Sequence, residues 1–355
     1  MQIYYFPYLF LNQADFIKYD NITVWNFEIC KKKQIRDDKL RAYVSSLLAA
    51  NRRLNKKIED LGVVALSGRN NFEPLDPKDS EEVSDFSKVL FLTTVAKSNT
   101  INNPHCMATS ENFGIVCQNF DLESKNTAYT SGKIVTTTSG GWKIGEIKYE
   151  MPHYVPTGPF KLDEDFLKVM QRLKIRKTKL YRLILRATDS MMQGYSNADD
   201  KSYSSRILEQ CRAFEILFAL PQKDQRKIFK KKIKEYCSSE GDWKVRYMSE
   251  RPKENKWETD VRQAMWADKF YTLRNHIIHG RKIKATEFQF LSQKHWDLGL
   301  MFFLVSVKQL INKALGKKIF YDKIKFKDRA FEYNQGHLLR ALEEVKRKLR
   351  PLLSG

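Results

Sequence analysis

A proline-rich stretch near the middle of the chain constrains the fold more than any other feature of the sequence. Residues 151–159 hold three prolines and a glycine in nine positions. Proline fixes the backbone angle φ and has no N–H to donate, so neither a helix nor a central strand can run through this stretch. We therefore predict a linker over residues 151–160 between two domains, 1–150 and 161–355.

The two sides of this linker have different hydrophobic patterns. Before it, short apolar runs bounded by turn residues predict strands at 2–10, 22–27, 62–66, 114–119, 133–138 and 142–149, and an amphipathic pattern predicts one helix at 38–51. The run 86–95 fits a helix or a strand. We expect a mixed α/β domain here, with a sensing or regulatory role.

After the linker the pattern is helical almost throughout. Helices, the first of them long or broken into a pair, are expected at 163–193, 203–220, 224–236, 258–279, 286–315 and 337–353. The predicted fold class is therefore α+β, with a mixed α/β N-terminal domain followed by an all-α helical bundle.

Basic residues are concentrated in the second domain. Residues 1–160 hold 19 Lys and Arg against 18 Asp and Glu, whereas residues 161–355 hold 44 against 24. A polyanion, RNA or DNA, is the usual partner of such a charge excess. A solvated surface or a contact with acidic lipids is the alternative.

Cysteine usage and hydropathy bear on the compartment. The five cysteines form no C-x-x-C pair, which suits reduced thiols in a cytoplasm. Polar residues and a glycine interrupt the longest apolar stretch, 298–310, and the N-terminus lacks the pattern of a signal peptide. We expect a cytoplasmic protein that does not contact a membrane.

The segment 270–280, FYTLRNHIIHG, carries the residues best suited to chemistry. Its apolar residues are spaced for the core face of a helix. Asn275 and His279 are four positions apart and share a face, and Gly280 is placed to end the helix. The long side chain of Arg274 can reach a cleft in front of that face.

This pattern of an arginine, a polar residue directly after it and a histidine five positions on resembles the catalytic motif of HEPN domains. The segment FYTLRNHIIHG and the helix RILEQCRAFEILFALP are similar to the ApeA-like HEPN branch. The resemblance covers about residues 181–315 and none of residues 1–150. It implies a HEPN-like nuclease domain that cleaves RNA without a metal, usually as a homodimer with two motif helices facing each other. It also implies a toxin or anti-phage role, as in abortive infection.

The resemblance makes Arg274, Asn275 and His279 the expected catalytic residues. Histidine titrates near neutral pH and can act as the general base or acid for attack by the ribose 2′-OH. A guanidinium stabilises the charge that grows on the phosphate. Asn275 would orient the imidazole or hold the phosphate. Because DNA has no 2′-OH, only RNA should be cleaved.

Further residues are expected to support this site. A carboxylate such as Glu215, set among apolar helix residues, needs a partner when it is buried. That partner is either the motif Arg or His, or a salt bridge with Arg212 or another helix; Tyr271 is the second supporting residue. The expected RNA contacts are His276, Lys230, Lys231, Lys232, Arg281 and Lys282.

Other interpretations of these residues stay open. The motif could be the end of an ordinary amphipathic helix, with His279 favoured by the helix dipole. The domain could also be a non-catalytic RNA-binding or dimerisation module. His276 and the lysine run around 230 could be solvated surface residues. The sequence has no P-loop, no G-x-G-x-x-G cradle and no completed set of metal ligands, so we expect neither a cofactor nor a metal.

Overall fold

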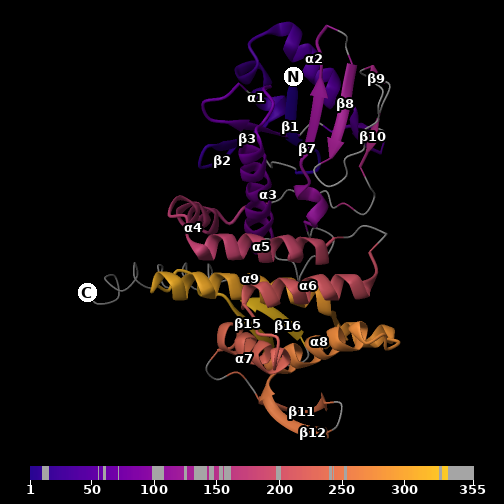
Figure 1. Ribbon diagram of the computed structural model, residues 1–355, viewed down its shortest axis with the longest axis vertical. Helices are drawn as coiled ribbons and strands as arrows, with labels where there is room; N and C mark the ends of the chain where they lie inside the picture. The colour runs from indigo at the N-terminus through magenta and orange to yellow at the C-terminus, as the bar shows by residue number, and fades with distance from the viewer. Residues whose placement is uncertain are drawn as a thin grey trace, which may run out of the picture. The chain divides into compact units, whose positions relative to one another are not determined.

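The chain divides into two compact units, shown in the computed structural model of Figure 1. The structure describes residues 1–9, 16–54, 56–58, 61–70, 72–97, 108–123, 126–131, 142–143, 148–151, 155, 161–196, 201–239, 242, 244–251, 254–327 and 330–334. The first unit is Met1–Lys177 with Ser196–Ala198, and the second is Thr178–Tyr195 with Asp199–Gly355.

The division between the units differs from the linker predicted at 151–160. Helix α4 (Glu164–Ile175) belongs to the first unit, because it packs on helix α3 (Pro77–Lys97). The backbone N–H of Asp163, just before α4, donates to the carbonyl of Thr93 in α3 at 3.0 Å. The predicted helix 163–193 is thus a broken pair whose members lie in different units.

A seven-stranded sheet in which every pairing is antiparallel forms the centre of the first unit. Its order is β2 (Phe16–Tyr19), β3 (Ile22–Asn26), β6 (Gly62–Leu66), β1 (Gln2–Phe6), β7 (Val116–Phe120), β8 (Asn126–Ser131) and β9 (Trp142–Lys143). A smaller sheet joins β10 (Tyr149–Glu150), β4 (Asn51–Arg53) and β5 (Lys56–Lys57).

Helices cover both faces of the large sheet. Successive side chains of a strand point to opposite faces, and Tyr5 and Trp25 share one core cluster with residues of α1 (Phe27–Gln34) and α2 (Asp38–Leu48). On the opposite face Tyr19 stacks on Phe86 of α3, with 5.1 Å between the ring centres. The ambiguous run 86–95 is therefore helical.

The sequence predicted most strands of this unit but not all of its elements. The strand predicted at 62–66 has the bounds of β6, and the predictions at 2–10, 22–27, 114–119 and 38–51 each correspond to a somewhat shorter element. The sequence did not predict β2, β4, β5, β8 or α1. The predicted strand 133–138 lies outside the described residues. Only the two ends of the strand predicted at 142–149 are described as strands, as β9 and β10.

The second unit is a helical bundle with added hairpins. Its helices are α5 (Lys179–Gly194), α6 (Tyr203–Leu217), α7 (Gln225–Cys237), α8 (Arg262–Ile278) and α9 (His295–Leu315). The hairpins pair β11 (Lys244–Arg251) with β12 (Glu254–Val261), β13 (Gln289–Phe290) with β14 (Gln293–Lys294), and β15 (Lys323–Lys327) with β16 (Ala330–Asn334). The α+β fold class is confirmed.

The prediction that this domain is all-α is wrong, because three hairpins accompany its helices, and two of them include residues predicted as helix. Residues predicted to start a helix at 258 form β12, where Trp257, Thr259 and Val261 alternate as strand formers do. The helix predicted from 286 begins only at His295, because a hairpin precedes it. The two loop residues of that hairpin, Leu291 and Ser292, have φ of 48° and 65°, as a type I′ turn requires. The predicted helix 337–353 lies outside the described residues.

Helix α9 crosses the core of the second unit. By length and composition it could span a membrane, but most of it is buried, and it packs against α5, α6 and α7. Phe302 of α9 stacks on Trp266 of α8, with 3.9 Å between the ring centres. Gly299 lets α6 approach closely, since a Cβ there would lie 2.2 Å from Gln210 Oε1.

A buried ion pair on α9 provides a test of this packing. Lys308 Nζ lies 3.3 Å from Asp322 Oδ1, and the two side chains are 0% and 2% exposed. Asp322→Ala leaves the ammonium buried without its carboxylate, so we expect the free energy of unfolding to fall by about 3–5 kcal/mol. Urea unfolding measures this loss.

The matched control replaces both members of the pair. Lys308→Met combined with Asp322→Leu removes both charges and keeps the volume apolar, so most of the stability should return. A loss of less than about 1 kcal/mol for Asp322→Ala alone, the range of exposed ion pairs, would contradict the burial of this pair.

Candidate functional site

The motif residues lie at the C-terminal end of α8, where a Schellman turn ends the helix. The N–H of Gly280 donates to the carbonyl of Ile277, and that of Arg281 donates to His276, each at 3.0 Å. These are the two hydrogen bonds of the Schellman motif. Gly280 has a left-handed φ of 70°, so the helix stops at His279, whose exposed side chain occupies the cap position.

Arg274 is held from three sides. Its Nη2 lies 3.1 Å from Glu215 Oε1 of α6, and its Nη1 donates to Asn275 Oδ1 at 3.0 Å. The guanidinium also lies 5.3 Å from the centre of the Tyr271 ring. A guanidinium has five N–H donors, and these contacts leave several of them for another acceptor. The side chain is 23% exposed, so that acceptor can come from solution.

Glu215 connects Arg274 to Tyr271. The Tyr271 hydroxyl lies 2.8 Å from Glu215 Oε1 and 2.7 Å from the side-chain oxygen of Gln225. With one proton it donates to the carboxylate, so the Gln225 amide must be turned over to donate to the phenol oxygen. Burial and the neighbouring carboxylate raise the pKa of Tyr271, which keeps this hydroxyl a donor.

The structure distinguishes the two alternatives for the partner of Glu215, a motif residue or Arg212. The carboxylate pairs with Arg274, as the first alternative predicted. Arg212 faces another acid, since its Nη1 lies 4.0 Å from Glu209 Oε2. Both supporting residues named from the sequence, Glu215 and Tyr271, therefore contact the motif arginine.

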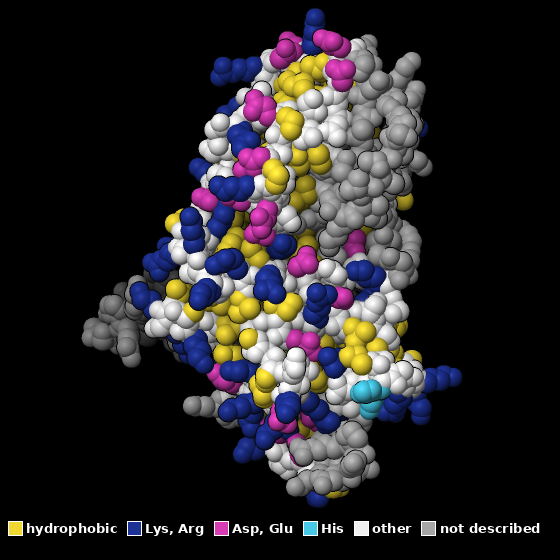
Figure 2. All heavy atoms as spheres, viewed as in Figure 1, with side chains coloured by type: hydrophobic (Ala, Val, Ile, Leu, Met, Phe, Trp, Pro, Cys, Tyr) yellow, Lys and Arg dark blue, Asp and Glu magenta, His cyan; other side chains and the backbone are white. Residues whose placement is uncertain are grey.

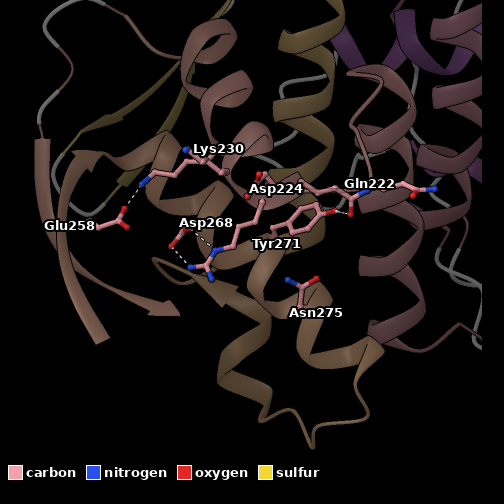
Figure 3. A pocket seen from close by; sticks show the side chains of 10 residues that line it. Gln222, Asp224, Lys230, Glu258, Asp268, Tyr271 and Asn275 are labelled. Carbon is pink, nitrogen blue, oxygen red and sulfur yellow. Dashed lines mark hydrogen bonds and ion pairs between the residues drawn. The ribbon is translucent and has the colours of Figure 1, made fainter. Parts of the chain in front are cut away.

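A hollow of about 720 Å³ opens beside Asn275, within the size range of small-ligand sites (Figure 3). Tyr271 and Asn275 of α8 form one side of it. The remaining lining residues come from the segment just before α7, from α7 itself, from β12 and from α8; they are Gln222, Asp224, Gln225, Arg226, Lys227, Lys230, Glu258 and Asp268. The sequence marked the lysines of α7 as a basic run, but nothing in its pattern marked Gln222, Asp224, Gln225 or Arg226 beyond a helix start.

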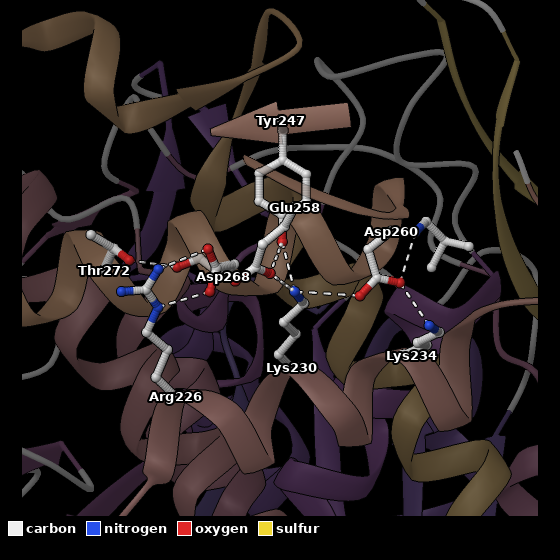
Figure 4. Close-up of polar contacts among 9 residues, drawn as sticks. Arg226, Lys230, Lys234, Tyr247, Glu258, Asp260, Asp268 and Thr272 are labelled. Atoms are coloured by element: carbon white, nitrogen blue, oxygen red, sulfur yellow. Dashed lines mark hydrogen bonds and ion pairs between the residues drawn. The ribbon is translucent and has the colours of Figure 1, made fainter. Parts of the chain in front are cut away.

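An ion-pair network forms one wall of this hollow (Figure 4). Arg226 donates from Nε and Nη2 to the two carboxylate oxygens of Asp268, each at 2.8 Å. Lys230 Nζ lies 2.5 Å from Glu258 Oε2 and 3.3 Å from Asp260 Oδ2. Burial opposes the charge on Lys230, but the hydrogen bond that its ammonium donates to Glu258 raises the pKa of Lys230 overall. The network ties α7 to α8 and to the hairpin β11–β12.

The lysines predicted to contact RNA differ in their surroundings. Lys230 is committed to the network above, and Lys232 Nζ lies 3.5 Å from Glu235 Oε2. Lys231 and Lys282 are exposed and form no ion pair with a described residue. On the face drawn in Figure 2, Lys and Arg side chains are spread over much of the second unit, with Asp and Glu between them. The exposed pair is better placed for a polyanion.

Arg281 and His276 contact each other after the turn. Arg281 Nη1 lies 2.8 Å from His276 Nδ1, and its Nη2 lies 3.4 Å from Glu287 Oε2. A guanidinium can only donate, so Nδ1 of His276 accepts in this contact. His279 is left as the imidazole at the exposed end of the helix. Among the described residues, no group of three or more His, Cys, Asp and Glu could hold a metal ion.

The left-handed Gly280 gives a prediction for the motif turn. Gly280→Ala puts a Cβ on a backbone with φ of 70°, although nothing lies within 4 Å of that Cβ. The cost is therefore conformational, and we expect about 1 kcal/mol of lost stability by urea unfolding. Gly280→Asn is the matched control, since asparagine tolerates this region better. Equal losses for the two variants would contradict this explanation.

The site combines a fixed guanidinium, an exposed imidazole five positions along the chain and an adjoining hollow. An imidazole can transfer protons near neutral pH, and a guanidinium with unused donors can bind phosphate oxygens. Together these groups suit acid–base chemistry on a phosphodiester. Comparison with protein-family models, with curated proteins and with solved structures finds no match to the chain.

Proposed function

We propose that the chain is a metal-independent endoribonuclease that cleaves RNA by attack of the ribose 2′-OH on the adjacent phosphate. The observation that supports this best is the fixed position of Arg274. Its guanidinium is held by Glu215, Asn275 and Tyr271 close to the end of α8, where the imidazole of His279 is exposed.

Two features of the sequence support the same proposal. The segment 270–280 resembles the HEPN motif, and the region from 161 to the end holds 44 basic against 24 acidic residues, as a nucleic-acid partner favours. A role as a toxin or anti-phage effector rests on the resemblance alone. The first unit would then sense a trigger or restrain the nuclease.

The proposed reaction assigns one task to each motif side chain. A histidine base takes the proton of the 2′-OH, and the 2′-oxygen forms a bond to phosphorus while the bond to the 5′-oxygen breaks. The unused N–H donors of Arg274 bind the non-bridging oxygens as their charge grows. Asn275 accepts from Arg274 through Oδ1, which leaves one of its two amide N–H groups for the phosphate. The products are a 2′,3′-cyclic phosphate and a 5′-OH.

A second copy of the chain completes this proposal. In-line attack sets the entering 2′-oxygen and the leaving 5′-oxygen on opposite sides of phosphorus, so one imidazole cannot serve both at the same time. His279 of a second protomer would supply the other proton transfer. We therefore propose a homodimer formed through the second unit.

The ion pair between Arg274 and Glu215 also favours a second candidate function. Because Glu215 balances the charge of Arg274, the pair could serve only to join α6 and α8 in a non-catalytic RNA-binding or dimerisation module. Such a module would bind RNA and leave it intact whatever residue stands at 279.

Substitution of the motif residues separates the two candidates. His279→Ala should lower the rate of RNA cleavage by at least about 100-fold, the usual contribution of a general acid or base. Arg274→Ala should lower it by about 100- to 1000-fold, as loss of a transition-state donor does. The control is Lys317→Ala, which removes an exposed cation just after the C-terminal end of α9. It should keep the parent rate. Cleavage by the His279→Ala protein at the parent rate would exclude the proposed site.

The chemistry itself is tested by the conditions and by the product ends. We expect cleavage to continue in excess EDTA and to yield 2′,3′-cyclic phosphate ends, identified by mass spectrometry. An oligonucleotide with a single 2′-deoxy sugar at the scissile position should resist cleavage there. Loss of cleavage in EDTA, or cleavage at the deoxy position, would contradict attack by the 2′-OH.

The dimer is tested by dilution. As the protein is diluted, the specific activity should fall in proportion to the fraction of dimer. Sedimentation velocity measures that fraction at each concentration. A mixed dimer with one His279→Ala protomer should lose most of its activity. Full specific activity in samples that sediment as monomers would contradict the proposed dimer.

A further inference from the structure

The hollow beside Asn275 has no part in the bond-making steps described above. We propose that it binds the base of a substrate nucleotide next to the scissile phosphate, and that Asp224 makes it select guanine. This inference names the substrate preference of the same site and rests on the proposed ribonuclease function.

Most of the charged residues that line the hollow form ion pairs with one another. The lining residues include three acids and three cations. Arg226 is paired with Asp268 at 2.8 Å, and Lys230 with Glu258 at 2.5 Å. A hollow whose charges cancel is a poor phosphate site but can take an uncharged base, which needs polar partners at its edge. The polar groups outside these pairs are Gln222, Asp224, Gln225, Lys227, Tyr271 and Asn275.

Asp224 has an unused carboxylate. It occupies the N-cap position of α7, yet its side chain makes no capping hydrogen bond, and its backbone is left-handed with φ of 57°. Five other polar N-cap side chains do accept from their helices: Asn26, Asp37, Asp163, Thr178 and Ser202. Asp224 also forms no ion pair with a described residue, and it is exposed. A carboxylate without these partners at the edge of a cavity is a candidate for ligand contact.

The chemistry of a carboxylate favours guanine among the four bases. The Watson–Crick edge of guanine carries two adjacent donors, N1–H and the N2 amino group, which match the two acceptor oxygens of a carboxylate. Adenine and cytosine each place an acceptor nitrogen beside their amino group, and uracil has a single donor between two acceptors. With adenine, cytosine or uracil, therefore, only one carboxylate oxygen can accept a hydrogen bond, and the other has no donor or faces an acceptor.

The remaining lining groups suit the other edge of guanine and its position. The amides of Gln222 and Asn275 can donate to O6 and N7 of a purine. Asn275 also accepts from Arg274 at 3.0 Å, so it contacts both the hollow and the guanidinium proposed to bind phosphate. A base in the hollow would thus belong to the nucleotide at, or next to, the scissile bond.

The test measures binding apart from cleavage, in full-length protein with His279→Ala. Fluorescence anisotropy compares a labelled oligouridine that has one central guanosine with the same strand carrying adenosine there. We expect about 10-fold tighter binding of the guanosine strand, within the usual range for a bidentate contact. Adding Asp224→Asn should reduce the ratio to about 2-fold or less, because the amide keeps only one acceptor. Asparagine tolerates the left-handed backbone, so the fold should be retained.

The control is Glu164→Gln, which neutralises an exposed acid of α4 outside the hollow and should leave the ratio unchanged. Equal affinity for the two strands, or a guanosine preference that persists in Asp224→Asn, would overturn the inference. The proposed function fails separately. If the parent chain leaves RNA intact but binds guanosine in an Asp224-dependent way, the nuclease proposal is wrong and the base site stands.

Discussion

The ion pair between Arg274 and Glu215 both bridges two helices of the second unit and fixes a candidate catalytic side chain. It links α8 to α6 at 3.1 Å, and both side chains are about one quarter exposed. In such partial burial, either group without the other would leave an unbalanced charge. The same contact fixes the guanidinium, and through Glu215 it fixes the Tyr271 hydroxyl and one edge of the hollow. The positions of these site groups are therefore linked through one ion pair.

The acidic residues of the second unit determine which of its cations remain available to the RNA partner proposed above. The chain from 161 onward has a large basic excess, but β12 turns toward α7 and neutralises two of its lysines. Lys230 and Lys234 both pair with Asp260. The basic run on α7 is thus partly an internal network that holds the hairpin, which is neither the RNA contact expected of Lys230 nor the solvated surface given as the alternative. Attraction of a polyanion then falls to exposed cations such as Lys231 and Lys282.

Local patterns in the sequence predicted which motif residues share a helix face and which buried group needs a partner. Helical spacing placed Asn275 and His279 on one face, and a carboxylate amid apolar residues indicated that Glu215 needs a partner. The turn at Leu291 and Ser292 could not be predicted in this way, because neither residue is a glycine or asparagine and both have positive φ. The sequence could not predict the hollow either, since its residues come from two segments, 222–230 and 258–275, that meet only through tertiary packing.

The pairing of Arg274 with Glu215 has a consequence for catalysis in the proposed nuclease. A guanidinium already paired with a carboxylate attracts a ground-state phosphate weakly, since its charge is largely balanced. As the reaction adds negative charge to the phosphate oxygens, the remaining N–H donors bind them more strongly. An interaction that grows in this way lowers the barrier, whereas equally tight binding of substrate would not. Affinity for the substrate must then come from elsewhere. The neutral hollow beside Asn275 and exposed cations such as Lys231 and Lys282 are the groups in the second unit placed to supply it.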